Sequence, residues 1–196
     1  IYNGIDARPF LEEIEDLKSE FNIPKNAFVV GHTGRFNQAK NHKTLINVAL
    51  DLCKLDNSIY FLLCGNGVKD NLEEIVSAAK LEKRIILQNN RDDIPKVLNS
   101  LDCFYFPSIT EGQPNSLIEA MVKSLPFVAS NINAIVETVP LGFHGQLIEP
   151  LDVISAKEKI IEIKNNFHKN NFKKLGKTVV NLYDAEYHFN QFYKEI

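Results

Sequence analysis

The sequence predicts an α/β fold, with a doubly wound and mostly parallel β-sheet that carries helices on both faces. Short apolar runs alternate with stretches whose apolar residues recur at helical spacing, which is the pattern of repeated strand–helix units. Right-handed crossovers between such units place the carboxyl ends of the strands along one edge of the sheet. A chain of 196 residues has the size of one domain and can bury a substantial core.

The elements are expected in the following order. A short amphipathic helix over residues 10–21 comes first. Strands follow near 28–32, 59–64, 84–87, 103–106, 127–129 and 146–148. Helices lie between most of them, near 42–55, 71–80, 94–101 and 115–123. In the helix at 42–55 the apolar positions 45, 46, 49, 52 and 53 fall at helical spacing, and from Asp152 onward only helices are expected.

The segment 111–119 places one carboxylate in a turn and a second inside the helix that the turn opens. Pro114 suits the first helical position, because its ring presets φ and the amide hydrogen that it lacks would be unpaired there. The free N–H groups that follow would attract a phosphate, and they belong to Asn115, Ser116 and Leu117. Glu119 lies one turn further and can accept hydrogen bonds from paired hydroxyls, such as a ribose diol. Glu111 can reach another part of the same ligand. The alternative is that Glu119 is an ordinary helix carboxylate and Glu111 an ordinary turn residue.

A second cluster follows the strand at 28–32, where a glycine-bounded turn carries Gly34 and Arg35, with Lys40 five residues on. Gly34 would let the backbone approach a ligand closely. Arg35 offers a phosphate a planar fork of donors, and Lys40 offers a point charge. The alternative is that both cations are solvated surface residues, as most lysines and arginines are.

These motifs meet at one edge of the predicted sheet. Residues that fall just after strand ends are Gly34, Gly65, Asn90 and Glu111. The carboxyl edge of an open α/β sheet is where ligands bind. Two turns that favour an anion on this edge predict a pocket for a polyanionic ligand.

The same residues resemble a known family. Gly34-Arg35 followed by Lys40 resembles its Gly-Arg-x-x-x-x-Lys element, and residues 65–67 resemble its Gly-x-Gly turn. Residues 107–121 resemble its Pro-Ser…Glu-Gly…Glu-Ala-Met signature. Together they are similar to the C-terminal half of the family 4 retaining glycosyltransferases, the "group 1" sugar transferases of bacterial polysaccharide and glycolipid synthesis. The resemblance covers nearly the whole chain.

The resemblance implies one half of a two-domain enzyme with two Rossmann-like domains facing each other across a cleft. Residues 1–8 would be a remnant of the interdomain linker, and 9–196 the domain that binds the nucleotide-sugar donor. The chain begins with Ile1 and its only methionine is Met121, so we expect a longer protein whose N-terminal domain binds the acceptor. Residues 182–196 are expected to form a C-terminal helix that packs either on that missing domain or on this sheet. The isolated chain is expected to be inactive, since its acceptor half is absent.

The resemblance also implies residue roles around a UDP- or GDP-linked sugar. Arg35 and Lys40, with the helix start, would stabilise charge on the diphosphate. Glu111 would hold sugar hydroxyls, in a pocket shaped by Gly112, Gln113 and Pro114, and Glu119 would hold the ribose. Backbone groups near Asn90 and Arg91 would contact the base. The chain has no Asp-x-Asp cluster suited to Mg²⁺, so we expect neither a cofactor nor an essential metal in this domain.

The composition excludes several other classes of protein. A net charge of −3 indicates neither nucleic-acid binding nor a strongly basic membrane surface. No apolar run is long enough to span a bilayer. Three cysteines without metal-ligand spacing are typical of reduced core residues. We therefore expect a cytoplasmic protein, and the resemblance leaves open a peripheral association with the inner face of the cytoplasmic membrane through the missing half.

Some departures and alternatives stay open. Many family members have Lys-Gly where this chain has Lys40-Asn41, a change that is tolerated if the turn does not need a positive φ. Residues 131–137 lack the Gly-Gly pair often found there, and His32 has no clear counterpart, so it is either a ligand contact or structural. A glycosidase would use two carboxylates but has no diphosphate to bind. A nucleotide-sugar 2-epimerase and a non-catalytic nucleotide-binding module remain as alternatives.

Overall fold

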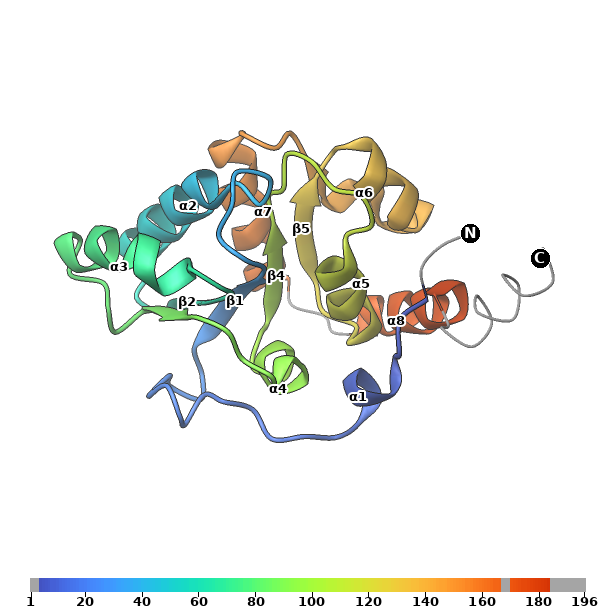
Figure 1. Cartoon of the computed structure of the whole chain (residues 1–196), viewed down its shortest axis with the longest axis horizontal. Coiled ribbons are helices and arrows are strands. Elements are labelled where there is room, and N and C mark those ends of the chain that lie inside the picture. The colour runs from blue at the N-terminus through green and yellow to red at the C-terminus, as the bar shows by residue number, and fades with distance from the viewer. Residues whose placement is uncertain (1–3, 167–169, 184–196) are drawn as a thin grey trace.

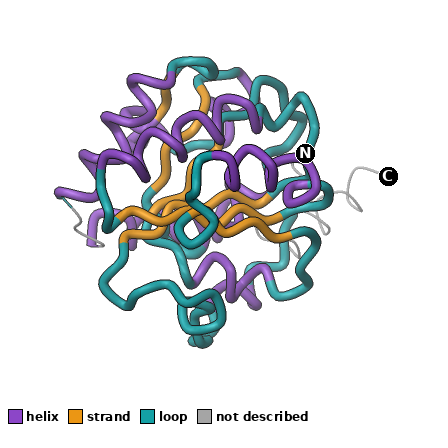
Figure 2. Tube along the Cα trace, turned by 90° about the vertical axis from the view of Figure 1, so that its left-hand side faces the viewer, coloured by secondary structure: helices purple, strands orange, loops and turns teal. Residues whose placement is uncertain are grey.

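The computed structural model describes residues 4–166 and 170–183 and contains one six-stranded sheet with helices on both sides (Figures 1 and 2). The strands are β1 (Phe28–Thr33), β2 (Ile59–Cys64), β3 (Ile85–Gln88), β4 (Cys103–Phe106), β5 (Phe127–Ser130) and β6 (Leu147–Ile148). They lie in the order β3-β2-β1-β4-β5-β6, and every pair is parallel. The predicted fold class is therefore confirmed.

The helices pack in two layers. They are α1 (Arg8–Leu11), α2 (His42–Leu55), α3 (Val68–Ala78), α4 (Ile94–Asn99), α5 (Asn115–Val122), α6 (Asn133–Thr138), the 3₁₀ helix η1 (Leu141–Gln146), α7 (Val153–Asn165) and α8 (Asn170–Tyr183). One core cluster joins the sheet to α2, α3 and α7, and the other joins it to α4, α5 and α8. The bounds of α2 agree with the prediction, because its buried residues follow one uninterrupted helical stripe.

The helix predicted over 10–21 is wrong. Helical structure ends at Leu11, and the backbone of Glu12 is extended. Four closely spaced carboxylates oppose a helix here, because like charges three and four residues apart repel; they are Glu12, Glu13, Glu15 and Asp16. The segment instead packs along α4, where the Leu17 amide donates to Ser100 Oγ at 2.7 Å and the Asn99 amide donates to the Ile14 carbonyl. Tertiary hydrogen bonds thus replace those of a helix.

Two further differences and one untested prediction concern helices. The short α6 was not predicted. Pro114 precedes α5 as its N-cap instead of occupying the first helical position. The C-terminal helix expected over 182–196 lies outside the described residues except for its first two positions, which end α8. Within the described part, Tyr183 is buried and its carbonyl accepts a hydrogen bond from the Ile5 amide, so the end of α8 is tied to the start of the chain.

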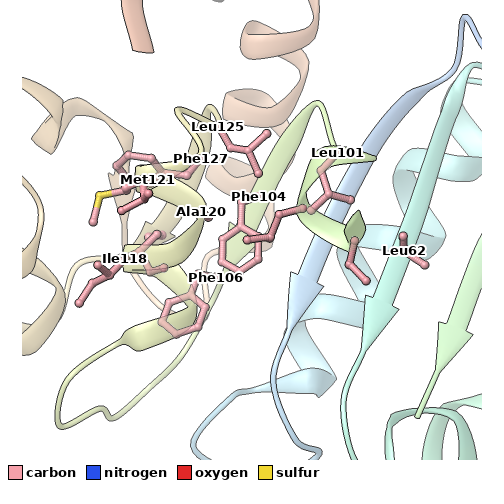
Figure 3. Close-up of a cluster of buried hydrophobic side chains, with 14 of the residues drawn as sticks. Leu62, Leu101, Phe104, Phe106, Ile118, Ala120, Met121, Leu125 and Phe127 are labelled. Atoms are coloured by element: carbon pink, nitrogen blue, oxygen red, sulfur yellow. The ribbon is translucent and has the colours of Figure 1, made fainter. Parts of the chain in front are cut away.

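The strand order reverses between β1 and β4, and this point positions the site. The chain leaves β1 towards β2 on one side and leaves β4 towards β5 on the other, so the loops after the two strands diverge. Pairing between the two strands stops at Gly31 and Phe104. Below this opening, Phe104 and Phe106 of β4 lie beside Ile118 and Ala120 of α5 (Figure 3). The aromatic strand therefore fixes the start of α5 against the end of the sheet.

Candidate functional site

The turn after β1 and the turn after β2 are locked together through glycine backbone. The Gly34 amide donates to the Cys64 carbonyl at 2.9 Å, and the Phe36 amide donates to the Asn66 carbonyl at 2.8 Å. A Cβ atom at Gly65 would collide with the Gly34 carbonyl, so only glycine permits this approach. The predicted glycine positions 34 and 65 are thus brought into direct contact.

Lys40 and Glu111, predicted from motifs 71 residues apart, form an ion pair. Lys40 Nζ lies 2.7 Å from Glu111 Oε1, and only 16 % and 9 % of the two side-chain surfaces are exposed. The ammonium also lies 4.6 Å from the centre of the Phe106 ring. The loops that carry the pair are joined by a hydrogen bond from the Ile109 amide to the Ala39 carbonyl. A cation and a carboxylate are therefore held together over the opening between β1 and β4.

Arg35 is placed differently from Lys40. Its side chain is exposed, and it makes no hydrogen bond or ion pair within the described part of the chain. Its backbone amide lies beside Gly65, since a Cβ there would be 2.9 Å away. The Arg35 guanidinium is thus a solvated cation at the edge of the site, whereas the Lys40 ammonium is largely buried within it.

The start of α5 offers fewer free amides than expected. The Asn115 amide donates to the Gln113 carbonyl and the Leu117 amide donates to the Pro114 carbonyl, so the expectation of three free groups is wrong for these two. Carbonyl groups of the turn before the helix accept both of these hydrogen bonds. The Ser116 amide donates to no backbone carbonyl of the described residues. Gly112 is exposed, and a Cβ there would meet nothing within 4 Å.

Glu119 lies one helical turn into α5 and is largely buried. Burial raises the pKa of its carboxyl group from 4.5 to about 7, against the opposing effect of the nearby Lys40 charge. The influence of Lys40 shows that both predicted carboxylates share one region of the sheet edge. A ligand that donates hydrogen bonds to this largely buried carboxyl group would favour its ionised form and lower its pKa.

Arg91 and Asn90 follow β3 at the outer end of the edge. The Arg91 guanidinium is already engaged, at 2.7 Å from Asp93 and 2.6 Å from Glu20, and it lies 5.3 Å from the Phe21 ring centre. Asn90 is exposed. The predicted contacts to the base come from backbone groups near Asn90 and Arg91, and the ion pairs of the Arg91 side chain do not affect them. The ion pairs show only that the Arg91 guanidinium is not free.

Residues 13–179 match the family model described as "Glycosyl transferases group 1". The chain belongs to the group 1 glycosyl transferases.

Curated relatives agree with this assignment, and a solved structure shares the fold. The UDP-Gal:alpha-D-GlcNAc-diphosphoundecaprenol alpha-1,3-galactosyltransferase of Escherichia coli is 31% identical over 175 residues, which are 85% of this chain and 45% of that protein. Anabaena Alr3699/HepE in complex with UDP and glucose superposes with a TM-score of 0.87 at 24% identity, over 100% of this chain and 55% of its own, which shows the shared fold. The chain spans about half the length of the curated relatives that it matches.

One departure of this group 1 domain from the family pattern has a structural explanation. Asn41 has a φ of 53°, so the turn does require a left-handed conformation. Asparagine adopts this conformation more readily than most residues. Its side-chain amide also donates to the carbonyls of Pro107 and Pro150, at 3.0 and 2.9 Å. Asn41 therefore ties α2 to the loops after β4 and β6, a role that a glycine could not fill and that the motif alone did not indicate.

Three further features of the group 1 domain concern metals, membranes and cysteines. Within residues 4–166 and 170–183, no group of three or more His, Cys, Asp or Glu side chains could hold a metal ion. In the same part of the chain, no helix combines the length and apolarity needed to cross a membrane. The three cysteines are buried and free.

Proposed function

We propose that this domain holds the nucleoside-diphosphate sugar in a retaining glycosyltransferase of polysaccharide or glycolipid synthesis. The observation that carries the proposal is the Lys40–Glu111 pair at the point where the strand order reverses. A largely buried cation for a phosphate and a carboxylate for hydroxyls stand side by side there, next to the Gly34–Gly65 contact that keeps side chains away. In a nucleoside-diphosphate sugar, the phosphate that would contact the cation is joined directly to the sugar whose hydroxyls would contact the carboxylate.

Each group has a part in the proposed transfer. As the glycosidic C–O bond breaks, negative charge grows on the diphosphate, and Lys40 and Arg35 stabilise it where it develops. Charge-assisted hydrogen bonds of this kind contribute about 1.5–3 kcal/mol each. Glu111 holds the sugar hydroxyls, with residues 112–114 shaping the pocket. The acceptor attacks from the face that the diphosphate leaves, so the anomeric configuration is retained.

The nucleoside lies further along the same edge. Glu119 accepts hydrogen bonds from the ribose hydroxyls, and backbone groups near Asn90 and Arg91 contact the base. Among the residues that the structure describes, the Ser116 amide donates to no backbone carbonyl, and it would donate to the diphosphate. We propose that two cations and this helix start replace a divalent metal in this domain. A chelator should then leave nucleotide affinity unchanged.

The rest of the enzyme is proposed from its relatives. An N-terminal domain would bind the acceptor, and the 196-residue chain alone would transfer no sugar. The E. coli relative is named for an acceptor linked to diphosphoundecaprenol. A lipid-linked acceptor of that kind would bring the whole protein to the inner face of the cytoplasmic membrane.

Thermal unfolding of the chain with added nucleotides tests the proposal. A ligand that binds only the folded state at 100 times its Kd stabilises that state by about 2.7 kcal/mol. UDP or GDP and the matching nucleotide sugars should raise the Tm, and the free nucleoside should raise it much less. The variant Lys40→Met should lose most of the difference between diphosphate and nucleoside. Equal Tm values with and without every nucleotide diphosphate would contradict donor binding.

A full-length enzyme separates the two remaining alternatives. A transferase releases the nucleoside diphosphate only when an acceptor takes the sugar. A 2-epimerase instead converts the nucleotide sugar without any acceptor, and a non-catalytic module binds it unchanged. Product analysis of the nucleotide sugar with and without acceptor therefore distinguishes all three.

A further inference from the structure

His32 lies at the end of β1, where pairing with β4 stops. The last paired residues are Gly31 and Phe104, and beyond them His32 Nδ1 lies 3.0 Å from the Tyr105 carbonyl oxygen. Since a carbonyl oxygen only accepts, Nδ1 carries the proton and donates. The imidazole thus takes the place of a backbone bond between the diverging strands.

The other ring nitrogen is a bare acceptor. Burial, together with the adjacent His42, lowers the pKa of His32 well below its usual range, so the ring is neutral. With its proton on Nδ1, the neutral ring presents a lone pair at Nε2. His32 is fully buried, and Nε2 has no hydrogen-bond partner within the described part of the chain.

Nε2 faces the underside of the Lys40 site. A Cβ placed on Gly34 would lie 3.0 Å from His32 Nε2 and 3.4 Å from both Cδ and Cε of Lys40. The Phe106 ring lies 5.8 Å from the His32 ring and near-parallel to it, and it also carries the Lys40 ammonium at 4.6 Å. The bare nitrogen and the lysine chain therefore converge on the same glycine and the same aromatic ring.

Packing alone does not require an imidazole here. A phenyl ring would also stack on Phe104 and Phe106, although it would lose the Nδ1 bond to the Tyr105 carbonyl, and that bond accounts for only one of the two ring nitrogens. A buried acceptor without a partner destabilises the folded state. The unpaired Nε2 is explained if a hydrogen-bond donor reaches it in another state of the molecule, such as the ligand-bound state.

We propose that His32 is a positioning residue for Lys40, whose Nε2 lone pair is a second acceptor for the lysine ammonium. An ammonium has three donors, and Glu111 engages one of them. When sugar hydroxyls occupy Glu111, Lys40 turns a donor to His32 and keeps its charge on the diphosphate. The inference rests on the proposed function, and it concerns how the cation is held.

A ligand-free measurement tests the contact itself. Long-range ¹H–¹⁵N spectra of the 196-residue chain should show His32 protonated at Nδ1 and bare at Nε2. In Glu111→Ala, which releases Lys40, the Nε2 signal should shift to that of an accepting nitrogen. The shift should vanish in Glu111→Ala/Lys40→Met. A ring protonated at Nε2, or an Nε2 signal unaffected by Glu111→Ala, would overturn the proposal.

A double-mutant cycle tests the consequence for binding. His32→Phe should weaken UDP or GDP binding about fivefold, the size of one lost hydrogen bond. In a Lys40→Met background the same change should have no further effect, because His32 acts through the lysine. A structural role would instead give equal losses in both backgrounds, and that additivity would refute the inference.

Tyr105→Phe is the matched control. It removes a buried hydroxyl that, like His32 Nε2, lacks a partner within the described part of the chain. The hydroxyl belongs to the residue whose carbonyl His32 contacts, and its loss should leave affinity unchanged. If the unmodified chain binds no nucleotide diphosphate, the proposed function fails, while the ligand-free spectra still decide whether His32 accepts from Lys40.

Discussion

Glu119 makes the stability of this domain depend on pH in a predictable direction. Burial raises the pKa of its carboxyl group in the folded state from 4.5 to about 7. The folded state therefore holds this proton more tightly than the unfolded state does. The stabilising contribution is complete below about pH 4.5 and is lost as the pH rises through 7. A difference of that size corresponds to about 3 kcal/mol.

Replacing Glu119 by glutamine isolates this contribution. The amide is neutral at every pH and has nearly the shape of the protonated acid. Glu119→Gln and the original chain should be about equally stable near pH 4.5. At pH 8 the variant should be about 3 kcal/mol more stable, because only the original chain keeps a charge in a largely buried position.

Urea unfolding followed by circular dichroism at several pH values between 5 and 8 measures the difference. Other titrating groups are common to both proteins and cancel. Glu74→Gln, which removes an exposed carboxylate from α3, is the matched control for the loss of one acidic residue. A stability difference between Glu119→Gln and the original chain that stays constant across this range would refute the argument that burial sets the charge of Glu119.

The remaining predictions concern the other groups of the site. Lys40→Met leaves Glu111 as an unpaired, largely buried carboxylate. The free energy of unfolding should therefore fall by about 2 kcal/mol, which corresponds to a Tm loss of about 4–8 °C. The double variant Lys40→Met/Glu111→Gln should recover most of this stability. Arg35→Ala should change stability by less than about 0.5 kcal/mol, since its side chain is exposed, yet calorimetry should find UDP or GDP binding about tenfold weaker; unchanged affinity would rule out its phosphate role. Gly65→Ala forces a Cβ into the Gly34 carbonyl and should cost about 3 kcal/mol in urea unfolding, whereas Gly112→Ala, where space is open, should be close to neutral.

The pH argument extends to ligand binding. Ribose hydroxyls that donate to Glu119 favour its ionised form, so nucleotide binding near pH 6.5 should release a proton. Calorimetry in two buffers of different ionisation enthalpy measures that proton. Binding without proton release by the original chain, or equal release by Glu119→Gln, would exclude the ribose role.

Local patterns predicted the elements whose signal is strong and periodic. Strands β2 and β4 and helix α2 have the predicted bounds, because short apolar runs and an unbroken helical stripe leave little choice. The segment 12–27 could not be predicted in this way. Its conformation depends on hydrogen bonds to Asn99 and Ser100, which are distant in sequence.

The residues of the candidate site were predicted by type, and their partners were not. Motif spacing singled out Lys40, Glu111 and Glu119, but a spacing contains no distance between loops. The amides of Asn115 and Leu117 were expected to be free, and the turn before α5 engages both. Asn41 was treated as a tolerated departure, and it proved to occupy a left-handed position and to join three loops.

The sequence by itself determined the succession of strands, most of the helices, the family and the residue types at the edge of the sheet, because these follow from local periodicity and from short motifs. Only the tertiary structure decided that Lys40 pairs with Glu111, that Glu119 is largely buried and that the unpaired Nε2 of His32 lies close to Gly34, as the Lys40 side chain does. The physical reason is that charge state and hydrogen bonding depend on burial and on neighbours, and both arise when β1 and β4 pair and their loops diverge.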